Sequence, residues 1–129
     1  MVKFDDLITT GRFIDGGRGP FDFDCWGLVR EIYSRYGIEL PDYTIPCEDA
    51  SRIGAEIDNN RACWIRCQGE PPTPALVVIR YGSEWCNHTG VYIGNGRFIH
   101  IREKAGVNID RVNAIGWRKK IEGFYIPGW

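Results

Sequence analysis

Residues 88–101 contain the pattern that most restricts what this chain can fold into. His88-Thr-Gly-Val-Tyr-Ile93 and Arg97-Phe-Ile-His-Ile101 are rich in strand-forming residues, and they flank Gly94-Asn95-Gly96. Two such runs joined by a short glycine-containing loop predict an antiparallel β-hairpin. Glycine at the third loop position suits a type I turn followed by a G1 bulge, so we predict a three-residue loop.

The loop length decides whether the two histidines of the chain share a face of this hairpin. A two-residue Asn95-Gly96 loop would pair Val91 with His100 and put His88 on the opposite face. The three-residue loop instead makes His88 and His100 diagonal neighbours on one face, roughly 7–8 Å apart at the backbone. The histidine face then also carries Gly90, Tyr92 and Phe98, and the other face carries Val91, Ile93, Ile99 and Ile101.

A cysteine lies where a pattern of helical period begins. A turn-rich segment, residues 16–20, precedes it, and apolar residues then recur at three- and four-residue spacing from Leu28. We expect this helix to end at Gly37. We expect Asp24 to cap this helix and Cys25 to lie in its first turn. There, free backbone N–H groups and the helix dipole favour the nucleophilic thiolate. The alternative is a buried cysteine that acts only as a small hydrophobic side chain.

These features together fit nucleophilic catalysis by a thiol. A cysteine nucleophile needs a base within hydrogen-bonding reach, and the base needs a third group to fix its tautomer and orientation. We predict that His88 is the base for Cys25 and that His100 orients His88. Histidines on opposite faces of the sheet would rule out this triad.

The order of the predicted elements indicates a single α+β domain over residues 1–129, with helices first and antiparallel strands after them. Residues 11–23 hold many glycines and a proline and are expected to form a loop. Residues 75–80 are apolar enough for a central strand. The expected helices cover residues 4–9, 24–36 and 47–59, and the expected strands cover residues 75–80, 88–93, 97–101, 107–110 and 120–126.

Composition and charge exclude several classes of protein. Sixteen basic and 17 acidic residues give a net charge of −1, which does not suit a nucleic-acid-binding surface. No apolar run is long enough to cross a membrane, and the first residues lack the apolar core of a signal peptide. We therefore expect synthesis in the cytoplasm without membrane insertion.

One alternative assigns His88 to a metal site. Cys63-x3-Cys67 and Cys86-x-His88 supply four possible soft ligands. Structural zinc sites prefer Cys-x2-Cys pairs, which this chain lacks, and five cysteines do not form a recognisable disulfide framework. We expect no metal and no cofactor.

The motifs resemble those of the NlpC/P60 cysteine peptidases, which have a papain-like fold. That family has Asp-Cys-Ser-Gly-Leu/Phe-Val at a helix start, His-Val-Gly-Ile-Tyr-Ile-Gly on a later strand, and a second histidine. The corresponding residues here are Asp24–Val29, His88–Gly94 and His100. The chain resembles the phage-tail members more closely, because these carry Asp-Cys-Trp-Gly-Leu-Val-Arg, as at residues 24–30.

The resemblance implies that Cys25 is the nucleophile, His88 the general base and then acid, and His100 the orienting residue. It implies hydrolysis of peptidoglycan stem peptides between γ-linked D-Glu and diaminopimelate or Lys, through a thioester and without metal. It also implies association with phage or prophage tail proteins and action at the cell wall. The residues expected at the substrate are Phe23, Asp24, Trp26 and Gly90.

Three departures from the family pattern concern substrate preference, and one of them is Pro74-Ala75 where the family has Gly-Asp. Phe23 replaces the family's tyrosine, which removes a hydroxyl, and Trp26 replaces a serine, which is expected to reshape the pocket. Asp24 is expected to cap the helix, and binding of a ligand amine is its alternative role. Two other functions remain open: a non-catalytic tail protein that keeps the fold, and an amidase or acyltransferase with the same Cys–His pair.

Overall fold

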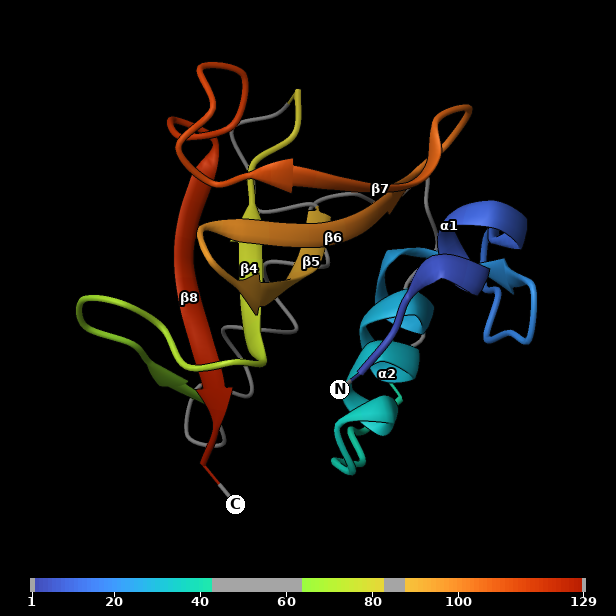
Figure 1. Ribbon diagram of the computed structural model, residues 1–129, viewed down its shortest axis with the longest axis horizontal. Coiled ribbons are helices and arrows are strands. Elements are labelled where there is room, and N and C mark those ends of the chain that lie inside the picture. Colours follow the sequence, from blue (N-terminus) through green and yellow to red (C-terminus); the bar gives the residue numbers. More distant parts are fainter. Residues whose placement is uncertain (1, 43–63, 83–87, 129) are drawn as a thin grey trace.

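A six-stranded antiparallel sheet with two helices on one side forms the described part of the protein (Figure 1). The computed structural model describes residues 2–42, 64–82 and 88–128. The helices are α1 (Asp5–Thr10) and α2 (Cys25–Arg35), and the strands of the sheet are β3 (Trp64–Arg66), β4 (Ala75–Ile79), β5 (His88–Gly94), β6 (Arg97–Arg102), β7 (Gly106–Arg111) and β8 (Ile121–Pro127). Their spatial order is β3-β8-β4-β5-β6-β7, so the α+β prediction is confirmed. The helix predicted over residues 47–59 lies outside the described residues.

The segment between the two helices is more regular than expected. Residues 11–23 were predicted to be a loop, but β1 (Arg12–Phe13) and β2 (Asp22–Phe23) pair in parallel within it. Strands of two residues are too short to produce a period in the sequence, so the pattern could not reveal them. This small ribbon leads the chain directly into α2.

Helix α2 begins and ends where the sequence predicts. The Asp24 carboxylate accepts a hydrogen bond from the Gly27 backbone N–H at 2.7 Å, which satisfies one of the free donors of the first turn. At the other end Gly37 adopts a left-handed conformation, with φ of 82°, which glycine accepts without steric cost. Cys25 is therefore fixed as the first residue of the helix.

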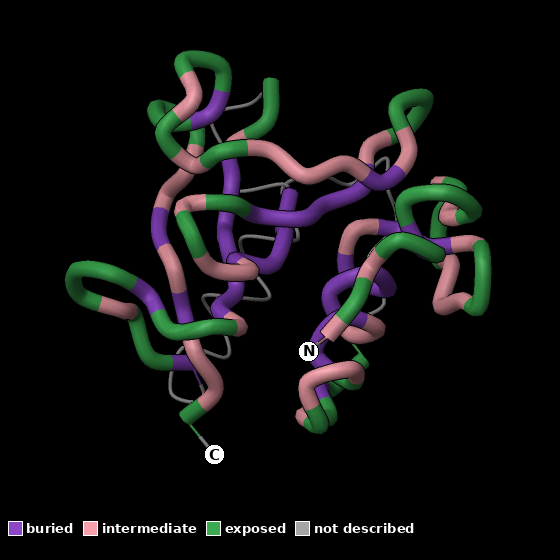
Figure 2. The backbone as a smooth tube through the Cα atoms, in the orientation of Figure 1, coloured by how far each residue is buried: buried purple, intermediate pink, exposed green. Residues whose placement is uncertain are grey.

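The core occupies both faces of the sheet. Helix α2 packs against β5 and β6 and covers the face that carries Val91, Ile99 and Ile101, as predicted. Tyr92 and Phe98 lie in a second cluster on the opposite face, together with Trp117. Figure 2 shows the buried segments along β4, β5 and β6, and all five residues of β4 are buried, as expected for a central strand.

The register of the hairpin is the predicted one, although its loop is shorter. Val91 pairs with Ile99, as the three-residue loop requires, but Gly94 pairs with Arg97, which leaves only two residues in the turn. Both are left-handed, with φ of 56° at Asn95 and 71° at Gly96. A bulge between Tyr92 and Gly94 shifts the register by one residue. The three-residue loop was therefore wrong, and the predicted histidine face was right.

Candidate active site

The two histidines lie side by side on the face of the sheet opposite Val91. The ring nitrogens His88 Nε2 and His100 Nδ1 are 2.9 Å apart, within hydrogen-bonding distance. Both side chains are buried, with 6% of His88 and 1% of His100 exposed. The predicted juxtaposition is confirmed, since β5 supplies one ring and β6 the other.

A third side chain, Asp110, extends this arrangement onto β7. Its Oδ2 lies 2.7 Å from His100 Nε2. Strands β6 and β7 pair Phe98 with Asp110 and His100 with Asn108, so Asp110 is a diagonal neighbour of His100. The sequence predicted a strand here without its register. The reasoning that placed both histidines on one face of the hairpin, applied to the pairing of β6 with β7, would have found this residue.

The thiol of Cys25 lies next to the residue that follows the predicted base. Cys25 is half-buried at the start of α2, and the backbone and side chain of Thr89 lie close enough to its sulfur to affect its pKa. Because Thr89 directly follows His88 in β5, the first turn of α2 meets the beginning of the histidine strand. The structure thus brings Cys25 to the residue after His88, while the pairing of its thiol with His88 stays a prediction.

The predicted thiolate is not the resting form of this cysteine. Burial, assisted by the negative charge of Asp24, raises the pKa of the Cys25 thiol to about 11, and the nearby polar groups of Thr89 only partly oppose this. The N-terminus of the helix was expected to lower this pKa and so to favour the thiolate. Desolvation is the larger effect here because the thiol is removed from water and lies beside an acidic cap.

The histidines are neutral for a related reason. Burial, followed by the nearby charges of His100 and Arg102, lowers the pKa of His88 to about 3. Burial also lowers the pKa of His100, although Asp110 opposes the shift. A neutral imidazole can accept a proton, so the resting site pairs a protonated thiol with an available base.

Aromatic side chains cover the histidine pair. The Trp117 ring is edge-on to His100 with the centroids 4.7 Å apart, and it stacks on Tyr81, whose ring is 5.7 Å from that of His88. Arg102 and Lys120 lie over the Trp117 ring, at 5.4 and 5.5 Å from its centroid. This cover accounts for the burial of the histidines, and the Arg102 charge further disfavours their protonation.

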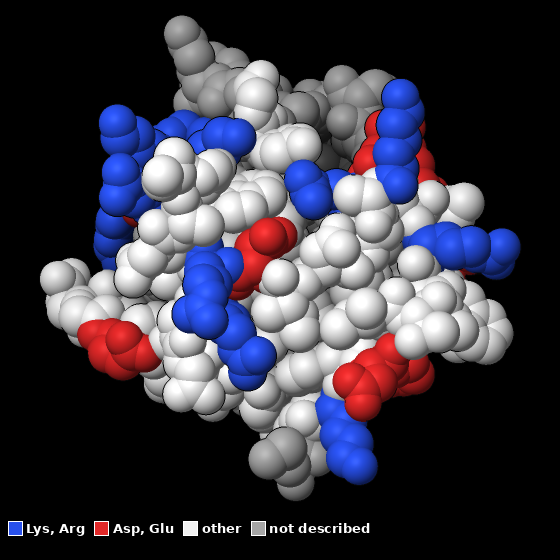
Figure 3. Space-filling model, turned by 45° about the horizontal axis from the view of Figure 1, so that its top comes forward, with Lys and Arg blue, Asp and Glu red and all other residues white. Residues whose placement is uncertain are grey.

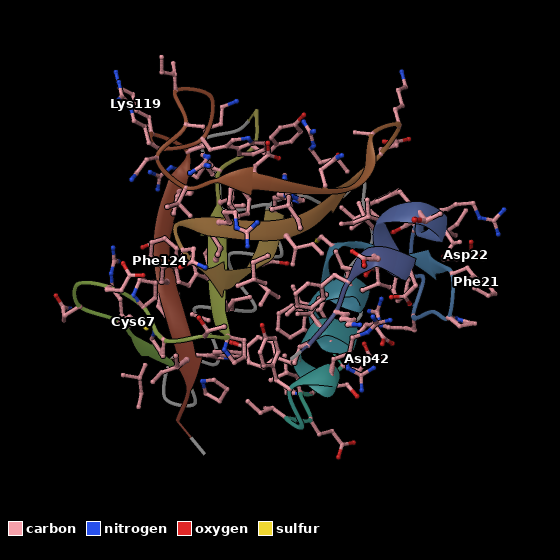
Figure 4. All side chains as sticks on the ribbon, viewed as in Figure 1. Phe21, Asp22, Asp42, Cys67, Lys119 and Phe124 are labelled. Carbon is pink, nitrogen blue, oxygen red and sulfur yellow. The ribbon has the colours of Figure 1, made fainter. Side chains whose placement is uncertain are left out.

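Asp24 is fully engaged in structural contacts. Besides capping α2, its Oδ1 accepts a hydrogen bond from Arg18 Nη1 at 2.7 Å, and Arg18 Nε donates to Asp42 at 2.7 Å. Only 4% of Asp24 is exposed. Figure 4 shows Asp42 beside α2. The capping role is confirmed, and these contacts add an ion pair that holds the loop before α2 against the segment after it.

Two residues predicted to contact the substrate are core residues. Phe23 is fully buried among the apolar residues under α2. Trp26 is 4% exposed, donates a hydrogen bond from Nε1 to the Pro41 carbonyl at 2.9 Å, and packs edge-on against Trp64. Burial of large aromatic side chains is strongly favourable, and here β2 directs Phe23, and the first turn of α2 directs Trp26, into the core. The predicted substrate contacts through these side chains stay a prediction, and the burial of both side chains argues against it.

Gly90, the fourth residue predicted at the substrate, makes room for the histidine pair. It lies between His88 and Tyr92 on the histidine face, and a Cβ atom there would lie 2.9 Å from the Ile99 carbonyl oxygen and 3.1 Å from His100 Cβ. Both distances are shorter than an ordinary van der Waals contact. Only a residue without a side chain lets β6 carry His100 this close to β5.

We expect Gly90→Ala to displace His100 and destabilise the sheet by about 1–3 kcal/mol, the usual cost of overpacking. The free energy of unfolding in urea and the kcat for a peptide substrate measure the two effects, and both should fall. Gly116→Ala is the matched control, because a Cβ there would meet no atom within 4 Å. Equal stability and equal kcat in the two variants would contradict this role of Gly90.

The described residues contain no group of three or more histidine, cysteine or acidic side chains arranged to hold a metal ion. Cys63 and Cys86, which belong to the alternative metal site, lie outside these residues.

Within the described ranges, no helix is long and apolar enough to cross a membrane. On the face that Figure 3 shows, basic and acidic side chains are interspersed.

Comparisons with known proteins agree with this architecture. The model of the NlpC/P60 family matches residues 11–125. The chain is 34% identical over 110 residues to the probable endopeptidase p60 of Listeria monocytogenes, and 30% identical over 110 residues to the murein DD-endopeptidase MepS/murein LD-carboxypeptidase of Escherichia coli. Each match covers 84% of this chain, which spans 20% of p60 and 52% of MepS. A crystal structure of an NlpC/P60 family protein from Bacillus cereus superposes on 95% of this chain and 39% of that protein, with a TM-score of 0.62 and 26% identity.

Proposed function

Because the chain belongs to the NlpC/P60 family, we propose that it is a cysteine peptidase that hydrolyses peptidoglycan stem peptides. Cys25 is the nucleophile, His88 the general base and then acid, and His100 the residue that orients His88. The observation that carries this proposal is the contact of His88 with His100 at 2.9 Å. Thr89, the residue after His88, lies against Cys25 at the start of α2. The names of the two relatives, a probable endopeptidase and a murein DD-endopeptidase, support the same reaction, and the second supports the same substrate class.

The proposed reaction has two steps. As Sγ of Cys25 attacks the carbonyl carbon, its proton passes to His88, and the tetrahedral oxyanion is stabilised by the Cys25 backbone N–H. The C–N bond then breaks, His88 returns the proton to the leaving amine, and a thioester remains on Cys25. Water, deprotonated by His88, attacks the thioester and releases the acid and the thiol. The burial of both histidines keeps bulk water from protonating the base.

The proposed bond is the one between γ-linked D-Glu and diaminopimelate or Lys, which the resemblance to the family implies. We also propose that the protein works as part of a phage or prophage tail. The sequence Asp-Cys-Trp-Gly-Leu-Val-Arg at residues 24–30 supports this location. Mass spectrometry of purified phage particles from a host that carries the gene tests it, since the chain should be present in tails and absent if it acts elsewhere.

Digestion of purified peptidoglycan tests the activity and the bond. Sacculi of the diaminopimelate and of the Lys type are incubated with the protein, and the released fragments are identified by mass spectrometry. We expect fragments that end in D-Glu. Fragments cut at another bond would replace the proposed specificity, and release of the intact stem peptide from the glycan would indicate an amidase. No release from either wall type would favour a non-catalytic tail protein.

A further inference from the structure

The hydrogen bonds of the site continue past the two histidines to a carboxylate. His88 on β5, His100 on β6 and Asp110 on β7 lie on one diagonal across three neighbouring strands. The successive contacts measure 2.9 Å and 2.7 Å, both normal hydrogen-bond lengths. Asp110 is the outermost of the three, with 31% of its side chain exposed, whereas the His100 side chain is fully buried.

The chemistry of these atoms permits one direction of donation. A carboxylate only accepts hydrogen bonds, so the proton between His100 and Asp110 belongs to Nε2 of His100. A neutral imidazole has one N–H, which leaves Nδ1 of His100 as an acceptor. The proton between the two rings therefore belongs to Nε2 of His88, and Nδ1 of His88 carries the free lone pair. In the proposed mechanism, that nitrogen accepts the proton of the thiol.

We propose that Asp110 is a positioning residue that sets the tautomer of His88 through His100. This inference rests on the proposed function, in which His88 is the base for Cys25. Without the carboxylate, His100 can hold its proton on Nδ1 and donate it to His88 Nε2. The His88 proton then occupies Nδ1, and the nitrogen that faces the reaction can no longer accept one. Asp110 also stabilises the imidazolium that His88 becomes when it takes the thiol proton.

The other polar neighbours of His100 do not provide this control. Asn108, directly opposite His100 on β7, directs its Oδ1 toward Arg102, at 3.5 Å. Trp117 presents a ring at 88° to the His100 ring, which gives packing and no acceptor for Nε2. Asp110 is therefore the acceptor that the described residues offer to this nitrogen.

The test is ¹⁵N NMR of the imidazole groups, together with steady-state kinetics, for the wild type, Asp110→Ala and Asp110→Asn. The chain has only two histidines, so each ring can be assigned by comparison with a single substitution. We expect both rings of the wild type to carry their proton on Nε2. In Asp110→Ala both should shift toward the Nδ1–H form, and kcat should fall about 10- to 100-fold with KM nearly unchanged, a smaller loss than that of a residue in direct contact with the base.

Asp110→Asn preserves the volume of the side chain and should show the same fall in kcat. It provides the test if the alanine variant does not fold. Glu103→Gln, an exposed acidic residue in the turn after β6, is the matched control and should leave tautomers and kcat unchanged. Wild-type tautomers and wild-type kcat in both Asp110 variants would overturn the proposal. The NMR measurement needs no substrate, so a shift of tautomers in a protein without peptidase activity would reject the proposed function and keep the role of Asp110.

Discussion

Cys25→Ala is expected to lower kcat/KM for a stem-peptide substrate by about 10⁴- to 10⁶-fold, the loss typical of removing a covalent nucleophile. The side chains on either side of Cys25 cannot take over the attack, because Asp24 and Trp26 are buried in structural contacts. The fold should persist, since the Asp24 cap that begins the helix does not involve the thiol. Circular dichroism and urea unfolding should therefore match the wild type.

Cys67→Ala is the control for this variant. Cys67 is also half-buried and unpaired, but it lies beside β8, away from α2 (Figure 4). Its substitution should leave kcat/KM within about twofold. An activity that survives in Cys25→Ala, or that is lost equally in Cys67→Ala, would remove Cys25 from the mechanism.

His88→Ala is expected to have the second-largest effect, a loss of about 10³- to 10⁵-fold in kcat, because the variant removes the proposed base for the thiol. The same variant should hardly change the rate at which iodoacetamide alkylates Cys25. The pKa of the thiol is raised to about 11 by burial and by Asp24, and that of His88 is lowered to about 3, so no thiolate–imidazolium pair exists at rest. A base that acts only during the reaction affects hydrolysis and not alkylation.

The pH dependence follows from the same two pKa values. Alkylation needs the thiolate, so below pH 11 its rate should rise about tenfold per pH unit as protons are removed. Hydrolysis needs neutral His88, which is present above pH 3 in the free enzyme, so the acidic limb of the kcat/KM profile should fall only near pH 3. Fast alkylation at pH 6 that disappears in His88→Ala would contradict this and indicate a preformed ion pair.

The sequence predicted the features that depend on local pattern. Asp24 and Gly37 define α2 through capping preferences that act within a few residues. The shared face of His88 and His100 follows from the alternation of side chains and the need to bury Val91 and Ile99. This prediction was therefore correct although the predicted loop length was wrong.

The differences concern properties that depend on tertiary packing. A thiol at a helix start suggests a low pKa, but the burial of Cys25 by Thr89 and its surroundings is not visible along the chain. Proximity of Phe23 and Trp26 to the nucleophile in sequence suggested substrate contacts, and the burial of their side chains argues against these contacts. Asp110 was missed because its role requires the register of a third strand.

The most direct test of the central claim is to locate the acyl group during turnover. The protein is mixed with a synthetic stem peptide, quenched in acid within milliseconds, digested and examined by mass spectrometry. We predict a thioester between the γ-D-Glu fragment and the peptide that contains Cys25, and neither thioester nor product from Cys25→Ala. An acyl group on another residue, such as Cys67, or product formation by Cys25→Ala would contradict the mechanism.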